Sequence, residues 1–303
     1  MKYFLLTSDV ETTSLVNHKL SDETGNLVAN TAIPVSLELY AKYNIKSTFF
    51  ITGYYASKYP ESVKMIYNAG HEVACHGYSH KHSEAFDQMN LEEQIEHLNK
   101  ARNIIEDIIS DQVISFRAPA LRTNRFTIEA LKRSGFKIDS SIASGRFDFF
   151  LSLGSLKKIN WLFAPRSYYF TSNERLYRKG DSGILEIPVT ANLIPYIGTI
   201  MRISPFIAKM VRYTVLGREH INFLIHPIEL VNEERDSDKI ERRSSNPIKY
   251  LLSDVIRHKL KIKNIGEPGI KLLEKQLEYF KNKGYSFITC KKYLEIIHER
   301  TTT

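Results

Sequence analysis

Cysteine is scarce in this 303-residue chain, and the sequence contains no long run of apolar side chains. The two cysteines, Cys75 and Cys290, cannot build the multiple disulfides of small secreted domains, so both are predicted to be buried thiols in a reducing compartment. No stretch approaches the roughly 18 apolar residues of a membrane-spanning helix. Ser8 and Asp9 end the apolar start of the chain too early for a secretory signal. The expected location is the cytoplasm, with the inner face of the membrane as a second candidate.

Acidic side chains are in the minority, and the net charge of +8 is unevenly distributed. Residues 155–218 contain ten Lys or Arg against three Asp or Glu, which gives this segment a charge of +7. A basic segment can attract phosphate, anionic lipid or nucleic acid, whereas a solvated rim explains it equally well. Because no recognisable nucleic-acid-binding motif accompanies these residues, nucleic acid is not an expected partner.

Short β-type runs alternate along the chain with segments whose apolar residues recur every three or four positions. This alternation predicts an α/β fold with a parallel sheet, either open or closed into a barrel. The predicted strands are Tyr3–Thr7, Ser47–Thr52, Glu72–Cys75, Ile114–Arg117, Lys137–Ser140, Ile184–Val189, Phe223–Ile225 and Ser286–Thr289. The predicted helices are Pro34–Tyr43, Pro60–Asn68, Leu91–Ile109, Thr127–Ser134 and Ile270–Asn282.

The segment 229–268 lacks this pattern and is rich in charges of both signs. Such a segment could be a linker between two domains. The residues that follow it, 270–290, look like one more β/α unit of the same sheet. We therefore expect one domain over residues 1–303, with 229–268 as a charged insertion.

Seven reactive side chains follow or end five of the predicted strands. They are Asp9 and Glu11 after the first strand, His76 and His80 after the third, Arg117 and Asp139 at the ends of the fourth and fifth, and His226 after Phe223–Ile225. In a parallel β/α fold the carboxyl ends of the strands converge on one face, where sites are built. These side chains are therefore predicted to gather into one site.

Two imidazoles and one carboxylate of this set can form a metal site. Glu11, His76 and His80 would supply three ligands and leave one position open for water. The spacing of four between His76 and His80 predicts that both rings lie on one face of a helical turn. The zinc-protease helix has a similar spacing, but there a Glu that acts as base follows the first His, and here that position is Gly77. The base must therefore come from elsewhere.

Asp9 is the candidate for that base, because a carboxylate beside a metal-activated water can take its proton. Arg117 is predicted to pair with Asp9 and to hold it ionised. His226 is predicted to be the general acid that protonates the departing group. Base, acid and three ligands together describe hydrolysis at a carbonyl group.

Five short motifs that contain these residues resemble, in order, those of the polysaccharide deacetylase family (NodB homology, carbohydrate esterase family 4). They are TSDVE, HGYSH, RAPA, KIDSS and FLIHP. The resemblance implies a distorted (β/α)7 barrel, a divalent metal that is usually Zn²⁺, and removal of acyl groups from amino sugars. It also implies the roles given above, with Asp9 as base, Arg117 as its partner, His226 as acid, and Glu11, His76 and His80 as metal ligands.

Two departures from the family motifs bear on the substrate. The first motif has Asp9 and Glu11 separated by one residue, where adjacent aspartates are commonest, and this resembles a variant of intracellular and lipid-sugar relatives. In RAPA, an alanine stands where an aromatic residue usually follows the proline. Pro119 and Asp139 are predicted to contact the substrate. The expected substrate is an N-acylated amino sugar, with acetyl as the first choice, in a glycan or in a lipid-linked or nucleotide-linked precursor.

A third departure leaves one role without a residue. The family's Asp-and-Trp motif, which orients the acidic histidine, is not evident, and Trp161 is the only tryptophan. The residue that orients His226 is therefore not predicted from the sequence. Without that motif, a catalytically silent glycan-binding or membrane-binding barrel is an alternative to an enzyme.

A second alternative is a non-haem iron oxygenase, because two histidines and a carboxylate also bind Fe(II). Such sites need no acid–base pair opposite the metal and usually occur in all-β folds, which the helical patterns oppose. A separate question concerns residues 192–218, which mix apolar side chains with four basic ones and contain no acid. This stretch could rest peripherally on anionic lipid, or it could be a barrel helix whose basic edge faces water.

Overall fold

The structure is a computed structural model that describes residues 1–16, 19–147, 159–233 and 255–302. Its central strand is β1 (Lys2–Val10), in which every residue after Lys2 is buried. Parallel strands covered on both faces have such near-continuous apolar sequences. β1 pairs in parallel with β10 (His220–Ile225) on one side and with β2 (Thr48–Ile51) on the other, and its first residues also pair with β11 (Tyr285–Phe287).

The remaining strands continue the sheet from β2 in the order β3, β4, β5, β7, β6. All pairings along this path are parallel except the last, where β6 runs antiparallel to β7. Beyond β7 the chain returns to β10, because Thr190 N donates to Asn222 O at 3.0 Å and Ile197 forms a parallel bridge with Leu224. The result is a distorted barrel of the (β/α)7 type. The bounds of these strands are β3 Glu72–Cys75, β4 Ser115–Phe116, β5 Ile138–Asp139, β6 Tyr169–Phe170 and β7 Leu185–Glu186, with a separate hairpin of β8 Ala191–Asn192 and β9 Ile194–Pro195.

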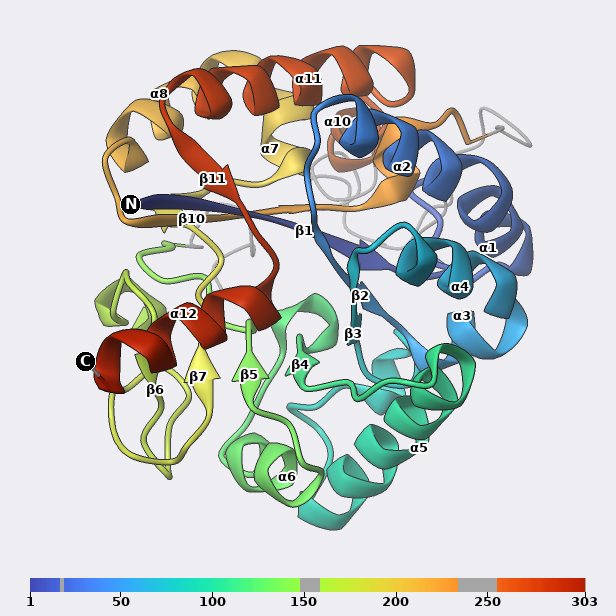
Figure 1. Ribbon diagram of the computed structural model, residues 1–303. Helices are drawn as coiled ribbons and strands as arrows, with labels where there is room; N and C mark the ends of the chain where they lie inside the picture. The colour runs from blue at the N-terminus through green and yellow to red at the C-terminus, as the bar shows by residue number, and fades with distance from the viewer. Residues whose placement is uncertain (17–18, 148–158, 234–254, 303) are drawn as a thin grey trace.

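Helices surround the sheet and lie against its outer surface (Figure 1). A large apolar core fills the space between them, and outward-facing strand residues such as Ile51, Cys75 and Phe116 belong to it. The helices are α1 Asp22–Leu27, α2 Ile33–Lys42, α3 Gly53–Lys58, α4 Pro60–Asn68, α5 Leu91–Ile109, α6 Thr127–Arg133, α7 Gly198–Ile203, α8 Pro205–Val215, α10 Arg257–Lys261, α11 Glu267–Asn282 and α12 Cys290–Thr302.

A second apolar core lies inside the barrel. Leu5, Phe50 and Ala74 point into it from β1, β2 and β3, and α12 contributes Tyr293 and Ile297. In Figure 1, α12 crosses in front of the strands near the C-terminus. Because α12 packs against this inner core, it closes the end of the barrel at which the strands begin, and the opposite end is left for the site.

The sequence-based elements are largely confirmed. All eight predicted strands are present, and the predicted helices Pro60–Asn68 and Leu91–Ile109 have the observed bounds of α4 and α5. The short helices α1, α3 and α7 were not predicted. Trp161 is buried in a satellite core on the barrel's flank.

The charged insertion that is expected at about 229–268 has packed residues at both edges. Glu229 is fully buried in a short 3-10 turn, Pro227–Leu230. At the other end, Gly266 N donates to Glu229 O at 3.2 Å, and α11 already begins at Glu267. Both ends therefore belong to the packed barrel. The centre of the segment, 234–254, lies outside the described residues.

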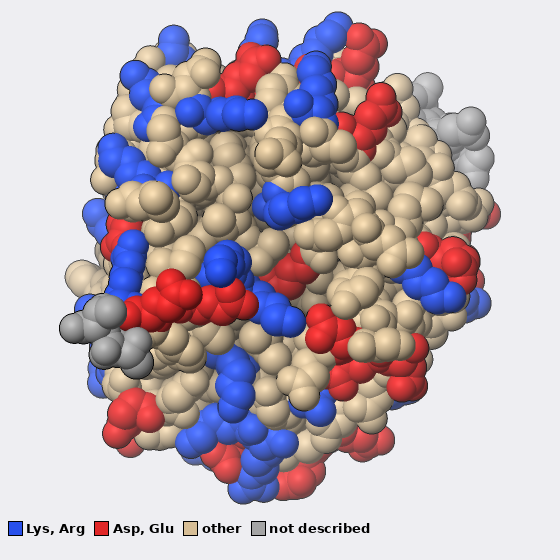
Figure 2. Space-filling view, viewed as in Figure 1, with Lys and Arg blue, Asp and Glu red and all other residues tan. Residues whose placement is uncertain are grey.

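The charges on the face drawn in Figure 2 alternate in sign, with Lys and Arg interspersed among Asp and Glu. The excess of positive charge thus does not form an uninterrupted basic stripe on this face. In the part of the chain that the structure describes, no helix combines the length and apolar character that crossing a membrane requires.

Candidate functional site

The pairing register of the strands brings the predicted residues together at the carboxyl end of the barrel. Ser8 lies opposite Ile225, so the next residues, Asp9 and His226, are neighbours at the ends of β1 and β10. Cys75 lies opposite Phe116 in the same way, which places His76 beside Arg117. The strand ends therefore converge as expected for a parallel β/α fold.

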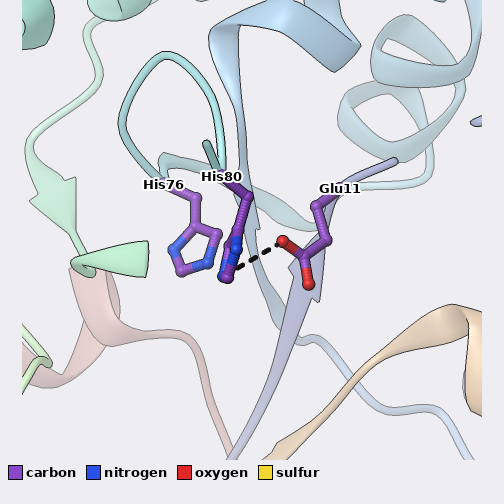
Figure 3. A group of neighbouring side chains, drawn as sticks. All are labelled: Glu11, His76 and His80. Carbon is purple, nitrogen blue, oxygen red and sulfur yellow. Dashed lines mark ion pairs between the residues drawn. The ribbon is translucent and has the colours of Figure 1, made fainter. Parts of the chain in front are cut away.

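Glu11, His76 and His80 form a group of potential metal ligands. One ligand atom from each lies within 4.8 Å of the others, and Glu11 and His76 are buried. Figure 3 shows the three side chains pointing toward one another, with Glu11 Oε2 3.2 Å from His80 Nε2. This arrangement is the one predicted from the sequence.

Two details of the group fit a divalent cation. His76 Nδ1 donates to Arg117 O at 2.7 Å, because a carbonyl oxygen can only accept, and this leaves the lone pair of Nε2 facing the group. Burial lowers the pKa of His76, so its imidazole is neutral, as a ligand must be. Glu11 Oε2 is buried and receives no hydrogen bond from the described residues. Two imidazole nitrogens and a carboxylate oxygen are a common ligand set for Zn²⁺.

The predicted helical turn between the histidines is wrong. Residues 76–81 form an extended loop in which Gly77 has φ +69°, a left-handed conformation that favours glycine. The loop is held because Gly77 O and Tyr78 O accept from Gly53 N and Tyr54 N at 2.8 and 2.7 Å. These bonds compete with helical ones, so the rings meet through the loop's curvature instead, with centroids 6.0 Å apart.

Asp9 and Arg117 form a buried ion pair beside the potential metal ligands. Arg117 Nη1 donates to Asp9 Oδ1 at 2.7 Å, and Asp9 Oδ2 lies 3.8 Å from His76 Nε2. Burial alone would raise the pKa of Asp9, but the Arg117 guanidinium outweighs it and holds that pKa below its ordinary value. Arg117 is itself held by Ser140 O, Ser140 Oγ and Thr7 Oγ1 at 2.8 to 3.1 Å. The carboxylate is therefore ionised and fixed in position.

His226 pairs with a residue that sequence reasoning missed. Its Nδ1 lies 3.0 Å from Oε1 of Glu229, three residues further along the same turn. Desolvation alone would lower the pKa of His226, but the hydrogen bond and charge of Glu229 raise it to about 9. The ring is 26% exposed and thus accessible from the site. The signal was present in FLIHPIEL, where the acid follows the histidine at a spacing of three.

Two further hydrogen bonds hold the Glu229 carboxylate in place. Arg202 Nε donates to Oε2 at 2.8 Å and Thr199 Oγ1 donates to Oε1 at 2.8 Å. Both Arg202 and Glu229 are fully buried. Burial would raise the pKa of Glu229, yet Arg202 and His226 lower it to about 2. Glu229 thus fills the orienting role for which the sequence offered no residue.

A further missed residue, His97 on α5, supports the histidine loop. Tyr78 N donates to His97 Nδ1 at 3.2 Å, and His97 Nε2 lies 3.4 Å from Glu84 Oε2. Glu84 also accepts from Ser79 Oγ, next to His80. No sequence pattern marks this contact, because it joins the loop to a helix about twenty residues away and involves only a lone histidine.

The structure does not bring Asp139 into the site, so its predicted substrate contact is wrong. Its neighbours Ile138 and Ser140 face the barrel interior, and Asp139 faces outward, fully buried. There it accepts from Ser141 Oγ at 2.6 Å and lies beside Glu186 of the paired strand β7. Pro119 is also buried, and it packs beside Gly77 under the histidine loop.

Comparisons with known proteins agree with the motifs. Residues 22–138 match the family described as polysaccharide deacetylase. A peptidoglycan deacetylase of Helicobacter pylori is 30% identical over 166 residues, which are 54% of this chain and 54% of that protein. A peptidoglycan deacetylase-like protein of Gibberella zeae is 35% identical over 98 residues, or 32% of this chain and 28% of that one. The matches thus span about half or less of the length of these curated relatives.

Solved structures share the fold at lower identity. A probable polysaccharide deacetylase from Pseudomonas aeruginosa PAO1 superposes with a TM-score of 0.60 at 12% identity, covering 96% of this chain and 88% of that one. A CE4 family pseudoenzyme from Bacillus anthracis gives 0.52 at 14% identity, covering 96% and 64%. The barrel and the ordered motifs agree with these matches: the chain resembles the polysaccharide deacetylase family, whose model matches residues 22–138, and its first motif has the D-x-E form.

Proposed function

We propose that this protein is a metal-dependent hydrolase that removes an acyl group, in the first instance acetyl, from the nitrogen of an amino sugar. One observation carries the proposal. The group of Glu11, His76 and His80 lies at the same end of the barrel as a buried carboxylate held by Arg117 and an imidazole held by Glu229. The names of relatives, which include peptidoglycan deacetylases and a chitooligosaccharide deacetylase, support this reaction class.

Glu11, His76 and His80 would hold the metal, and Zn²⁺ suits their mixed nitrogen and oxygen donors. A divalent ion bound there would act as a Lewis acid, lowering the pKa of water to about 7 and polarising the amide carbonyl. The protein prepares this site in advance, because the Arg117 carbonyl orients His76 through its Nδ1 at 2.7 Å.

Asp9 would take the proton from the attacking water. Its Oδ1 is engaged by Arg117, and its Oδ2 points toward the metal group, 3.8 Å from His76 Nε2. As the water oxygen bonds to the carbonyl carbon, its proton passes to the carboxylate. The Arg117 pairing keeps Asp9 from moving and keeps it ionised before the reaction.

His226 would protonate the departing nitrogen. The raised pKa of His226 keeps the ring cationic at neutral pH. Because the Nδ1 proton is hydrogen-bonded to Glu229, the proton available for transfer is the one on Nε2. When the C–N bond breaks, the nitrogen takes this proton, and a free amine and a carboxylate are released. Asp9 and His226 follow paired residues of the neighbouring strands β1 and β10, and each shifts the pKa of the other.

We further propose a lipid-linked or nucleotide-linked sugar on the cytoplasmic side as the substrate. Both cysteines are free and buried, which is compatible with a reducing compartment. The D-x-E first motif supports the same choice through its resemblance to lipid-sugar relatives. A polymeric glycan is the competing substrate.

Acetate release from a panel of N-acetylated nucleotide sugars, lipid-linked sugars and chitooligosaccharides, with zinc or with chelator, tests the proposal. We expect release from at least one precursor, abolition by chelator and restoration by zinc. The variant Asp9→Asn is the matched control, since it should bind zinc without turning over. A protein that binds no divalent ion and releases nothing would be a silent barrel, and dependence on Fe(II) and 2-oxoglutarate would instead identify an oxygenase.

A further inference from the structure

Helix α8 (Pro205–Val215), at the upper left of Figure 1, has two apolar faces. The inner face is formed by Ala208, Val211 and Val215, which are buried in the main core. Arg212 anchors the same side to α11, with its guanidinium carbon 3.9 Å from the centre of the Tyr279 ring. The orientation of the helix on the barrel is therefore fixed by packing.

The outer face of α8 is also apolar. Phe206, Met210 and Tyr213 are 71%, 55% and 56% exposed, and their spacing of four and three places them in one row. Ile207 extends the row at its edge and is also exposed. A helix on the surface of a globular protein normally presents polar residues on this side. A continuous exposed row of large apolar side chains marks an interaction surface.

Basic residues flank this row. Lys209 is exposed on the same face, and Lys263 Nζ bonds to Ile203 O at 2.9 Å, immediately before α8 begins. Between Glu186 and Glu219 the sequence contains no acidic residue. An apolar row with flanking lysines complements the surface of an anionic bilayer, where hydrocarbon lies beneath a layer of negatively charged headgroups.

We propose that the outer face of α8 docks peripherally on an anionic lipid bilayer. Phe206, Met210 and Tyr213 enter the headgroup region, and Lys209 and Lys263 contact lipid phosphates. The proposal concerns binding alone and does not depend on the catalytic role of the barrel. A second copy of the chain is the competing occupant, but a two-fold contact through this face would bring two basic faces together.

Co-sedimentation with vesicles tests the proposal. The full chain is mixed with vesicles of phosphatidylcholine alone or of phosphatidylcholine with phosphatidylglycerol. We expect sedimentation with the anionic vesicles, weakened by salt, and little with the neutral ones. Phe206→Ser and Met210→Ser should each weaken binding about tenfold or more, and so should Lys209→Glu.

Matched controls lie on α4. Met65→Ser and Lys64→Glu change an exposed methionine and an exposed lysine there, and binding should be unchanged. The proposal is overturned if anionic vesicles do not sediment the protein, or if the α4 variants lose binding as much as the α8 variants. Light scattering provides a separate check: a dimer that Met210→Ser converts to monomer would assign the face to a second copy and would also overturn it.

Discussion

His226 and Glu229 form an ion pair within one turn of chain, with 3.0 Å between Nδ1 and Oε1. Glu229 also accepts a hydrogen bond from the fully buried Arg202. Glu229 thereby fixes the ring orientation and raises the pKa of His226 to about 9. An acid that must be protonated to act loses activity as pH rises through its pKa.

Replacing Glu229 by Gln should move the alkaline limb of the pH profile. The amide keeps the size of the side chain but removes the charge that holds the proton on His226. In a zinc-loaded enzyme assayed with its best substrate, we expect kcat/KM to fall about 10–100-fold at neutral pH, as for other residues that orient a site. The descending limb should begin at lower pH than in the wild type. Glu267→Gln, which alters an exposed ion pair with Lys271, is the matched control.

A fall in kcat/KM with an unmoved pH profile would mean that Glu229 has only a structural role. Because Glu229→Gln also leaves Arg202 without an anionic partner, the thermal midpoint should drop. The double variant Glu229→Gln/Arg202→Met should recover part of that midpoint while keeping the altered pH profile, since only the charge at His226 sets the profile.

Asp9→Asn should separate metal binding from turnover. Arg117 retains bonds to Thr7 and Ser140, and the oxygen of the introduced amide can still accept from its guanidinium, so the fold should persist. We expect zinc content to match that of the wild type, with kcat reduced about 10²–10⁴-fold because no base takes the proton. Metal analysis and acetate release on the same sample measure both. Wild-type turnover in this variant would show that the base is another group.

His76→Ala should abolish the response of stability to zinc. A ligand that binds only the folded state stabilises it by about 2.7 kcal/mol at a 100-fold excess over Kd. The wild-type thermal midpoint should therefore rise with zinc and fall with chelator, and that of His76→Ala should not respond. His82→Ala, an exposed histidine six residues on, is the control and should behave as the wild type. If the wild type, His76→Ala and His82→Ala respond equally to zinc, the metal binds elsewhere.

Long helices with periodic apolar residues, and the reactive residues at strand ends, could be predicted because both depend on local sequence patterns. α5, for example, has nineteen residues, apolar repeats and an N-terminal capping box at Asn90. The shortest helices could not be predicted, because tertiary contacts hold them in place. α1 and α3 have six residues each and rest on the single caps Ser21 and Thr52. Helices this short are not stable by propensity alone.

The gathering of the six proposed catalytic and ligand residues could be predicted because they lie at or just after strand ends, whereas the residues that support them could not. His97 reaches the histidine loop from a helix, and no local pattern encodes that distance. The predicted role of Asp139 is wrong because a position at a strand end does not show to which face of the sheet the side chain points. Successive side chains of a strand point to opposite faces, so a shift of one residue moves a side chain from the barrel interior to its outer surface. The same limit applies to α8, where apolar spacing does not distinguish the buried row from the exposed one.

Asp139 and Glu186 are buried next to each other outside the site. We therefore expect the free energy of unfolding to depend on pH. Both carboxyl groups are fully buried on neighbouring strands, and Asp139 Oδ2 and Glu186 Oε2 have no donor among the described residues. A proton shared between them supplies that donor. Burial and the neighbouring carboxylate raise the pKa of Glu186 well above its ordinary value, and burial also raises that of Asp139. Of the other charged or titratable neighbours, Arg117 opposes the shift of the pKa of Glu186, and the pair helps to raise the pKa of Tyr169.

A carboxyl group with a raised pKa contributes stability that is complete below its unfolded pKa, about 4.3 for Glu. That contribution is lost as pH rises through the folded-state pKa. The free energy of unfolding should therefore decline from mildly acidic to alkaline pH. Glu186→Gln supplies a permanent N–H donor to Asp139 and removes one titrating group, so it should flatten this decline. At pH about 8 it should be more stable than the wild type by on the order of 1 kcal/mol.

Urea unfolding of wild type and Glu186→Gln across this pH range measures the difference. Glu174→Gln, an exposed glutamate in the same region of the chain, is the control and should keep the wild-type slope. If Glu186→Gln follows the wild type at every pH, the two carboxyl groups do not share a proton. If it is less stable at acidic pH and equal at alkaline pH, the proton is shared but the amide does not replace it, because its N–H fails to reach Asp139 Oδ2.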